Sequence, residues 1–320
     1  MTNYDVFNGD ADGICALAQL RLAEPREAVI ITGVKRDIDL LKQVDARTGD
    51  RVTVLDVSLD KNRADLDRVL AAGASVFYVD HHFPGDSLPD HPALSTIINE
   101  AADVCTSLLV DSHLKGAFRG WAIVGTFGDN LRKSALGLAK GSGYSEEQLR
   151  RLEDLGIYMN YNGYGSNLED LHFPPAELYE KAVRFRDPLD FISSSNGDFE
   201  KLETGYRQDM RQAAELPPES ATDKTAVFMF PDEPWARRVS GVYSNDLANN
   251  HPDRAHAILT RRKDGNYLVS VRAPLSNKTG AVDLCKQFPT GGGRAAAAGI
   301  NELPTDMLGQ FIDTFSAFYS

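Results

Sequence analysis

Short apolar runs alternate with amphipathic segments through the N-terminal part of the chain. The apolar runs are rich in β-branched residues and predict strands at residues 4–7, 29–32, 51–57, 75–79 and 95–98. The segments between them repeat apolar residues three and four positions apart and predict helices at residues 14–22, 38–44 and 62–72. Strands that alternate with helices build βαβ units. We therefore expect an α/β domain with a doubly wound, mostly parallel sheet.

The pattern becomes mostly helical from residue 102 to about residue 216. Ser145 and Gln148 have the spacing of a capping box, which predicts a helix that runs toward Tyr158. Alternation then returns, with predicted strands at residues 225–230, 255–260 and 267–272 and predicted helices at 240–249, 281–287 and 305–318. This second pattern predicts a smaller C-terminal α/β domain. The segment 216–224, with its two prolines, is typical of a linker. We thus expect an N-terminal domain over 1–190, a helical connector and linker over 191–224, and a C-terminal domain over 225–320.

The net charge of the chain limits which binding partners we expect. The chain has 320 residues and a formal net charge of −12. Negative charge repels polyanions at long range, so we do not expect the chain to coat duplex DNA. A few local cations can still bind a short or small phosphorylated ligand. Many proteins are equally acidic, so the charge by itself identifies no partner.

The cysteines indicate a reducing compartment. Cys15, Cys105 and Cys285 are widely spaced and form no C-x-x-C pair, which favours buried thiols over a disulfide or a zinc site. The N-terminus shows no basic segment followed by an apolar stretch, and no apolar run is long enough to cross a membrane. We therefore expect a cytoplasmic location and no membrane partner. The sequence sets no oligomeric state.

Acidic residues follow the predicted strands of the first domain. Asp10 and Asp12 come after the first strand, Asp56 lies near the end of the third, and Asp80 follows the fourth. The carboxyl ends of parallel strands meet at one edge of the sheet, where ligands bind. We therefore expect these carboxylates to lie close together.

The turn after the first strand reads Asn-Gly-Asp-Ala-Asp-Gly. Its two carboxylates, two positions apart, can converge on one or two hard cations, and Gly13 permits a tight entry into the next helix. The alternative is an ordinary turn in which Asp12 caps that helix.

Asp80, His81 and His82 are adjacent. A carboxylate beside two imidazoles suits a metal ligand that a second group orients, whereas the alternative is a solvated loop. Asp56 and the later Asp129 supply further carboxylates.

A glycine run marks the C-terminal domain. Gly291, Gly292 and Gly293 precede Arg294 and a stretch of alanines. Exposed backbone N–H groups beside one guanidinium can bind a phosphate. The alternative is a flexible loop before an alanine-rich helix.

Taken in order, the motifs D-x-D, D, D-H-H, D and G-G-G-x-x-x-A-A-G resemble those of the DHH phosphoesterase family with its DHH-associated C-terminal domain. The resemblance extends from Asn8 to Gly299. It implies an active-site cleft between a metal-binding catalytic domain and a substrate-binding domain, and two divalent ions, usually Mn²⁺, with Mg²⁺ as an alternative. The implied metal ligands are Asp10, Asp12, Asp56, His81 and Asp129, of which Asp56 would bridge the two ions.

The resemblance also assigns the remaining residues. Asp80 and His82 would form the catalytic pair, in which His82 faces the phosphate. The implied substrate-binding residues are Arg272, Gly291, Gly292, Gly293 and Arg294.

Two positions depart from the family pattern. Val6 replaces a common histidine ligand four residues before Asp10, so the first metal site is expected to be weak or to need substrate. Asn8 is a further candidate ligand there through its amide oxygen. Arg294 replaces a histidine, which favours phosphate binding over proton transfer.

The function implied is manganese-dependent hydrolysis of terminal phosphoester bonds in short oligonucleotides. Two alternatives stay open: an exopolyphosphatase acting on phosphoanhydrides, and a non-catalytic sensor of phosphate ligands with a degenerate first metal site. Tyr158, Tyr161 and Tyr164 are candidates to stack bases, or belong to the core or a hinge.

Overall fold

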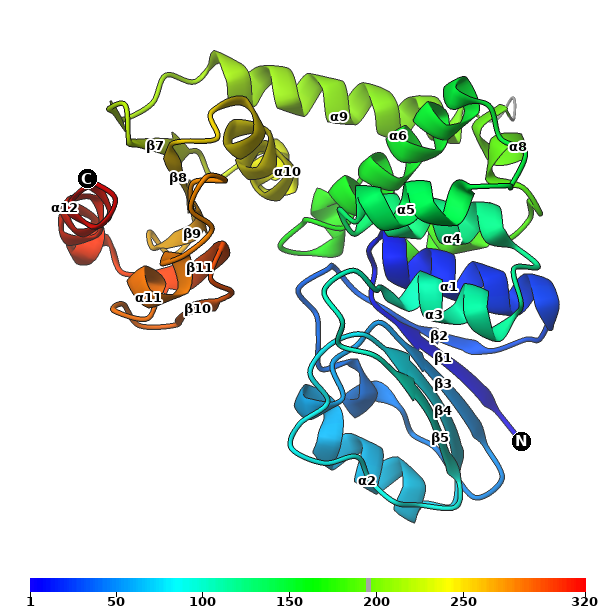
Figure 1. Ribbon diagram of the computed structural model, residues 1–320. Coiled ribbons are helices and arrows are strands. Elements are labelled where there is room, and N and C mark those ends of the chain that lie inside the picture. The colour runs from blue at the N-terminus through cyan, green and yellow to red at the C-terminus, as the bar shows by residue number, and fades with distance from the viewer. Residues whose placement is uncertain (194–196) are drawn as a thin grey trace. The chain divides into compact units, whose positions relative to one another are not determined.

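The computed structural model describes residues 1–193 and 197–320 (Figure 1). The chain forms two compact units, Met1–Thr204 and Gly205–Ser320. The division falls inside helix α9 (Asp198–Glu215), within the segment that the sequence predicts as a connector. Among the described residues, no helix has the length and apolarity needed to span a membrane.

The N-terminal unit is built on a sheet of five parallel strands in the order β2-β1-β3-β4-β5. This confirms the parallel sheet predicted from the alternation of strands and helices. The strands are β1 (Asn3–Phe7), β2 (Val29–Ile31), β3 (Arg51–Leu55), β4 (Ser75–Asp80) and β5 (Leu94–Ile98).

Helices cover both faces of this sheet (Figure 1). On one face lie α1 (Ala11–Ala23) and α3 (Thr106–His113), and on the other lies α2 (Arg63–Ala71). The remaining helices of the unit are α4 (Arg119–Gly128), α5 (Arg132–Ala139), α6 (Glu146–Asn162), α7 (Pro175–Ala182) and α8 (Pro188–Ser193). Short 3₁₀ turns are η1 (Leu40–Gln43), η2 (Asp60–Asn62) and η3 (Leu168–Asp170).

Two local predictions had opposite outcomes. The capping box is present, because the Ser145 hydroxyl accepts from the Gln148 backbone N–H and the Gln148 side chain accepts from the Ser145 N–H. The helix predicted at 38–44 is only the turn η1. The buried Asn62 side chain takes backbone groups that a helix would use: it donates to the Ile38 carbonyl at 2.6 Å and accepts from the Leu41 N–H at 3.1 Å.

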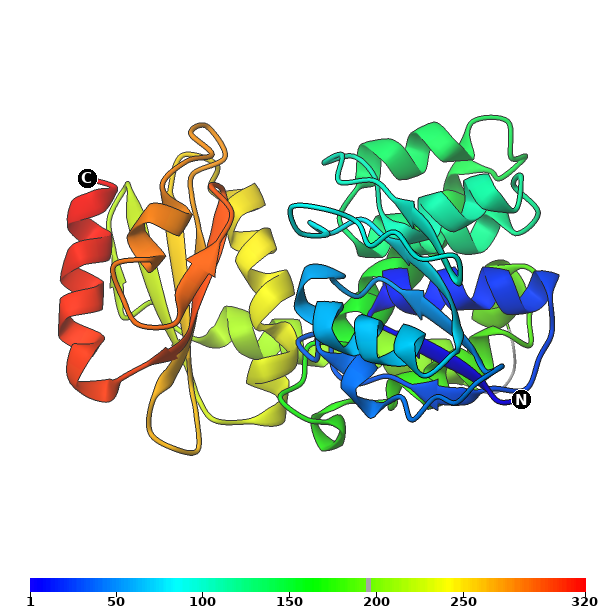
Figure 2. The ribbon, with the colours of Figure 1, turned by 90° about the horizontal axis from the view of Figure 1, so that it is seen from below.

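The C-terminal unit contains a six-stranded mixed sheet in the order β10-β11-β9-β8-β7-β6. Figure 2 shows α10 (Pro234–Asn250) on one face and α12 (Leu308–Phe318) on the other. The strands are β6 (Ser220–Ala221), β7 (Thr225–Phe230), β8 (Ala255–Arg261), β9 (Tyr267–Arg272), β10 (Gly291–Gly293) and β11 (Ala297–Leu303). A short helix, α11 (Ala281–Cys285), and the turn η4 (Thr305–Met307) complete the unit.

A buried ion pair joins α1 to the centre of the parallel sheet. The Arg21 guanidinium donates to both carboxylate oxygens of Asp5, at 2.7 Å from Nε, and its Nη2 donates to the Thr53 hydroxyl at 3.0 Å. Asp5 and Arg21 are almost fully buried. The pair fixes α1, and therefore the loop that precedes it, against β1 and β3.

We predict that Asp5→Ala destabilises the protein by about 3–5 kcal/mol, because it leaves the Arg21 charge buried without its partner. Chemical denaturation measures this loss. The control is the exposed pair of Arg132 and Glu153, whose atoms lie 2.8 Å apart. There, Arg132→Ala should cost no more than about 1 kcal/mol. Equal effects in the two variants would contradict the role given to the buried pair.

Candidate metal centre

Acidic residues and histidines gather at the carboxyl ends of the parallel strands. Asp10 and Asp12 follow β1, Asp56 follows β3, and β4 ends on Asp80 before the two histidines. The four acids are at most 3% exposed. Asp129 joins them from the end of α4. The gathering predicted from the strand ends is therefore present.

Asp10 is anchored by the helix that it begins. Its Oδ1 accepts from the backbone N–H groups of Asp12 at 3.0 Å and Gly13 at 3.2 Å. The capping residue of α1 is thus Asp10, and the alternative that placed the cap at Asp12 is wrong. Burial alone would raise the pKa of Asp10, but the Lys35 ammonium and the helix N–H groups hold it below its ordinary value.

Asp12 reaches a different helix. Its two carboxylate oxygens accept from the backbone N–H groups of Thr106 and Ser107, each at 2.7 Å. These groups lie in the first turn of α3, where N–H groups lack helical partners and the helix dipole favours negative charge. The Asp12 side chain is therefore held at a defined position.

Asp56 adopts a left-handed backbone conformation, with φ at 58°. Residues other than glycine rarely adopt it, and such strain is concentrated at functional sites. Its Oδ1 accepts from the Thr106 hydroxyl at 3.3 Å and lies 3.4 Å from His81 Nε2. Burial, with the neighbouring charges of Asp10 and Asp12, raises the pKa of Asp56 well above its ordinary value.

The His81 ring is oriented by a carbonyl. Its Nδ1 lies 2.9 Å from the Val104 carbonyl oxygen, which can only accept, so Nδ1 carries a proton. Nε2 then faces the acids, 3.4 Å from Asp56 and 3.9 Å from Asp129. This is the arrangement by which proteins present a histidine to a metal.

The acids also change the protonation of His81. Burial alone would lower its pKa, but the hydrogen bond and charge of Asp56, with the charges of Asp12 and Asp129, raise it to about 10. Without a metal ion, the acids therefore hold a second proton on the ring, at the nitrogen that faces them. A site that holds this proton so strongly is one that favours a cation.

His82 is held by the buried acid before it. Its Nδ1 lies 2.8 Å from Asp80 Oδ1, as expected for an acid that supports the histidine pair. Asp80 is fully buried, and its second oxygen has no hydrogen-bond partner among the described residues. The side chain of His82 is about one-third exposed, so the ring is within reach of a ligand from solvent.

Two sets of side chains could each hold a metal ion. One is Asp12, His81 and Asp129, and the other is Asp56, His81 and His82; within each set the ligand atoms lie within 4.8 Å of one another. Carboxylate oxygens with imidazole nitrogens suit Mn²⁺ and other divalent first-row ions. The donor set therefore fits the implied metal.

Lys35 is a component that the sequence reasoning did not single out. Its Nζ lies 2.5 Å from Asp10 Oδ2, 2.7 Å from the Asn160 side-chain oxygen and 5.3 Å from the centre of the Tyr164 ring. Burial lowers the pKa of Lys35, but the Asp10 charge more than compensates and raises it well above its ordinary value. Lys35 follows β2 at the same edge as the acids, so the strand-end rule places it near the site but does not identify its partners.

Asn8 lies in the same loop as Asp10. Its side-chain N–H donates to the Lys35 carbonyl at 3.2 Å, and its amide oxygen accepts from the Asp10 N–H at 3.2 Å. These bonds tie the loop after β1 to the loop after β2. A role for Asn8 as a metal ligand stays a prediction.

In the C-terminal unit, Arg272 ends β9 and is oriented by neighbours. Its Nε donates to the Asn245 side chain at 2.9 Å and its Nη1 to the Ser270 hydroxyl at 3.3 Å. Asn245 comes from α10, so sequence spacing alone could not connect it to Arg272.

The glycine run forms the edge strand β10, paired antiparallel with β11. Gly291 must be glycine because a Cβ atom there would lie 1.8 Å from the Cys285 carbonyl oxygen. No atom lies within 4 Å of the Cβ position at Gly292. Arg294 is exposed, and the alanines after it enter strand β11, so the alternative of a loop before an alanine-rich helix is wrong.

Two of the three tyrosines belong to the core. Tyr158 and Tyr161 are 4% and 0% exposed, and the Tyr161 hydroxyl bonds to His172 Nε2 at 2.9 Å. They cannot stack on bases in this structure. Tyr164 is partly exposed and faces Lys35.

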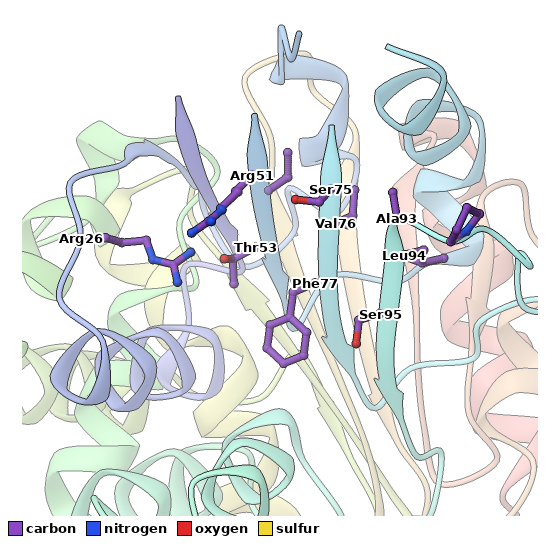
Figure 3. A pocket seen from close by; sticks show the side chains of 11 residues that line it. Arg26, Arg51, Thr53, Ser75, Val76, Phe77, Ala93, Leu94 and Ser95 are labelled. Atoms are coloured by element: carbon purple, nitrogen blue, oxygen red, sulfur yellow. The ribbon is translucent and has the colours of Figure 1, made fainter. Parts of the chain in front are cut away.

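A cavity of about 290 Å³ lies at the amino ends of the strands (Figure 3). Its lining includes Arg51, Ser75 and Leu94, the first residues of β3, β4 and β5. The cavity is thus at the amino ends of the strands, whereas the acids and histidines are at the carboxyl ends.

We predict that, without divalent ions, raising the pH destabilises the protein. Burial raises the pKa of Asp129 to about 6 and the acids raise that of His81 to about 10, so the folded chain binds protons more tightly than the unfolded chain. The Asp129 contribution is lost as the pH rises from about 4 to 6, and that of His81 as it rises from about 6.5 to 10.

Thermal melts in a chelator, compared with melts in Mn²⁺, measure this effect. The melting temperature should fall across these ranges, and Mn²⁺ should raise it most at high pH, where it competes least with protons. Asp129→Asn should remove the fall in melting temperature between about pH 4 and 6. The exposed control Asp60→Asn should keep that fall. A melting temperature that Mn²⁺ does not change at pH 9 would contradict the metal centre.

No family model and no curated protein sequence matches the chain. Solved structures do match in fold. RecJ of Thermus thermophilus, solved with Mn²⁺, aligns with 99% of this chain and 52% of its own, at 18% identity and a TM-score of 0.66. The chain thus spans about half the length of that protein.

Two further structures match over almost all of both chains. The pGpG-specific phosphodiesterase PggH of Vibrio cholerae covers 100% of this chain and 99% of its own, at 15% identity and a TM-score of 0.57. CDC45 of Entamoeba histolytica covers 99% and 95%, at 9% identity and a TM-score of 0.50. The parallel sheet, the second mixed sheet and these matches agree with the ordered motifs: the chain has the fold of the DHH phosphoesterases.

Proposed function

We propose that this protein is a divalent-ion-dependent phosphoesterase, most active with Mn²⁺, that hydrolyses terminal phosphoester bonds of short oligonucleotides or similar small phosphorylated molecules. One observation carries the proposal: His81 presents Nε2 to Asp56 and Asp129, with Asp12 in the same cluster. RecJ with its Mn²⁺ and the pGpG-specific PggH support the metal and the class of substrate.

Asp12, Asp56, His81 and Asp129 would hold the tighter ion. A divalent ion bound there supplies Lewis-acid stabilisation of the negative charge that develops on a phosphoryl group. The imidazole favours Mn²⁺ over Mg²⁺, which prefers ligands that are all oxygen. The bonds from α3 to Asp12 and from Val104 to His81 fix two of the ligands before any ion binds.

His82 is the residue that we propose to handle a proton. Asp80 accepts a hydrogen bond from Nδ1 of His82. Nε2 of the same ring is then left to donate to a phosphoryl oxygen or to protonate the departing oxygen. Donation from Nε2 requires a proton on each ring nitrogen, because Nδ1 keeps its proton in the bond to Asp80. Asp80 therefore serves to position His82.

Arg272, Arg294 and the β10 backbone are proposed to bind substrate phosphates other than the reacting one. Both side chains are guanidinium groups, which bind phosphate in a bidentate manner. Asn245 and Ser270 limit the rotamers of Arg272, so less side-chain entropy is lost on binding.

A second candidate substrate is polyphosphate. The burial of Tyr158 and Tyr161 removes two of the side chains that could have stacked on bases. An exposed arginine next to backbone N–H groups suits a chain of phosphates equally well. The non-catalytic sensor is less well supported, because Asp12, His81 and Asp129 lie together as a possible ligand set and His81 is oriented for metal binding.

We predict that the wild-type protein with Mn²⁺ turns over at least one member of a panel of dinucleotides, short oligonucleotides, pyrophosphate and polyphosphate. Asp56→Asn should lower kcat by more than the roughly 100-fold typical of losing an outer-sphere partner. Asp60→Asn, an exposed acid four residues away, should keep wild-type turnover. Wild-type rates in Asp56→Asn would rule out the proposed centre, and no turnover of any substrate would favour the sensor.

We predict that Arg294→Ala raises KM about tenfold for substrates with several phosphates, because a charge-assisted hydrogen bond is lost. A small artificial phosphodiester should be hydrolysed almost normally, since remote contacts help only substrates that reach them. The control is Arg262→Ala, which removes another exposed arginine of the same unit. It should change neither the KM for substrates with several phosphates nor the hydrolysis of the small phosphodiester. An equal loss on both substrates would place Arg294 in the chemistry or in the fold.

A further inference from the structure

The position beside Asp10 already holds a cation. The Lys35 ammonium lies 2.5 Å from Asp10 Oδ2, and Asp10 Oδ1 is occupied by two backbone N–H groups of α1. A carboxylate offers about four acceptor positions, so most of those on Asp10 are in use. A divalent ion at Asp10 would have to displace Lys35 or share the carboxylate with it, against the repulsion of like charges.

Lys35 is held in place from several directions. Its Nζ also donates to the Asn160 side chain at 2.7 Å, and its backbone N–H donates to the Gly163 carbonyl at 2.8 Å. Its backbone carbonyl accepts from the Asn8 side chain. The two side-chain bonds hold the ammonium between Asp10 and Asn160, and the backbone bonds hold the loop that carries it.

The loops that carry Asp10 and Lys35 are also packed closely. A Cβ atom at Gly9 would lie 1.9 Å from the Gly33 carbonyl oxygen, so only glycine permits this approach. The approach brings the loop after β2 against the loop after β1. The backbones that carry Asp10 and Lys35 are therefore close together.

The strand before Asp10 supplies no metal ligand at Val6. This side chain is fully buried and packs in the hydrophobic cluster that includes Val54 and Tyr78. The histidine ligand that the family has at this position is therefore missing for an ion at Asp10.

Charge is the reason that the Lys35 ammonium bears on the number of ions. The ammonium lies against Asp10 and already offsets one negative charge there. A divalent ion at the same carboxylate would lie close to this ammonium and be repelled by it.

We propose that the Lys35 ammonium takes the place of a first divalent ion, so that the substrate-free centre binds one ion, at Asp12, Asp56, His81 and Asp129. Of the three N–H groups of the ammonium, two are directed to Asp10 and Asn160, and the third donates to a phosphoryl oxygen of the substrate. The inference rests on the proposed metal centre and changes the number of ions that it contains.

The test counts Mn²⁺ ions. Equilibrium dialysis with metal analysis should give one ion per wild-type chain, and the electron paramagnetic resonance spectrum should be that of an isolated ion. Lys35→Met keeps the length and apolar character of the stem but removes the charge. It should bind two ions with an exchange-coupled spectrum, because Asp10 is then without a cation.

Two variants control this experiment. Lys35→Arg keeps the positive charge and should still bind one ion. Lys42→Ala removes an exposed lysine that lies 2.5 Å from Asp39, an ion pair of the same length outside the centre, and should also bind one. Circular dichroism checks that each variant is folded.

The other outcomes overturn the proposal. Two ions in the wild type, or one ion in both the wild type and Lys35→Met, would show that Lys35 does not occupy a cation position. Either result leaves the proposed phosphoesterase intact. No bound ion in any variant would instead overturn the metal centre and, with it, the proposed function.

Discussion

The mutual repulsion of buried carboxylates is the constraint on which the rest of this structure depends. Asp10, Asp12 and Asp56 are each nearly fully buried, and the charges of Asp10 and Asp12 help to raise the pKa of Asp56. Acids rarely gather in this way unless cations or N–H groups balance them. The chain supplies that balance from several elements, and a bound ion would complete it.

Helix N-termini provide the first part of the balance. Asp10 begins α1 and Asp12 accepts from the first turn of α3, so two carboxylates face the positive ends of two helices. Lys35 and His81 provide the second part, as cations that lie against the acids. The parallel sheet makes this possible, since neighbouring strands end at one edge and their loops meet there.

Much of this could be predicted from the sequence, because it rests on local rules. The period of the apolar residues predicted the parallel sheet, and the strand ends located Asp10, Asp12, Asp56 and Asp80. Turn η1 could not be predicted from its own residues, since the side chain of Asn62, distant in sequence, takes its backbone groups. Strand β10 was also not predicted, because glycine has a low intrinsic strand propensity and the strand forms by pairing with β11.

Lys35 shows the same limit at the centre itself. A lysine after a short strand is ordinary in sequence, and its role depends on Asn160, which is far along the chain. The motifs name the residues that we propose to bind a metal, but they do not name Lys35. Only the packing of the loops after β1 and β2 brings Lys35 to Asp10.

The central claim is that the acids and histidines at the carboxyl ends of β1, β3 and β4 bind a divalent ion. Anomalous diffraction from crystals soaked in Mn²⁺ tests it directly. The account predicts a strong manganese peak within coordination distance of Asp12, Asp56, Asp129 and His81 Nε2. A peak confined to exposed acids elsewhere, or no peak at millimolar Mn²⁺, would contradict it.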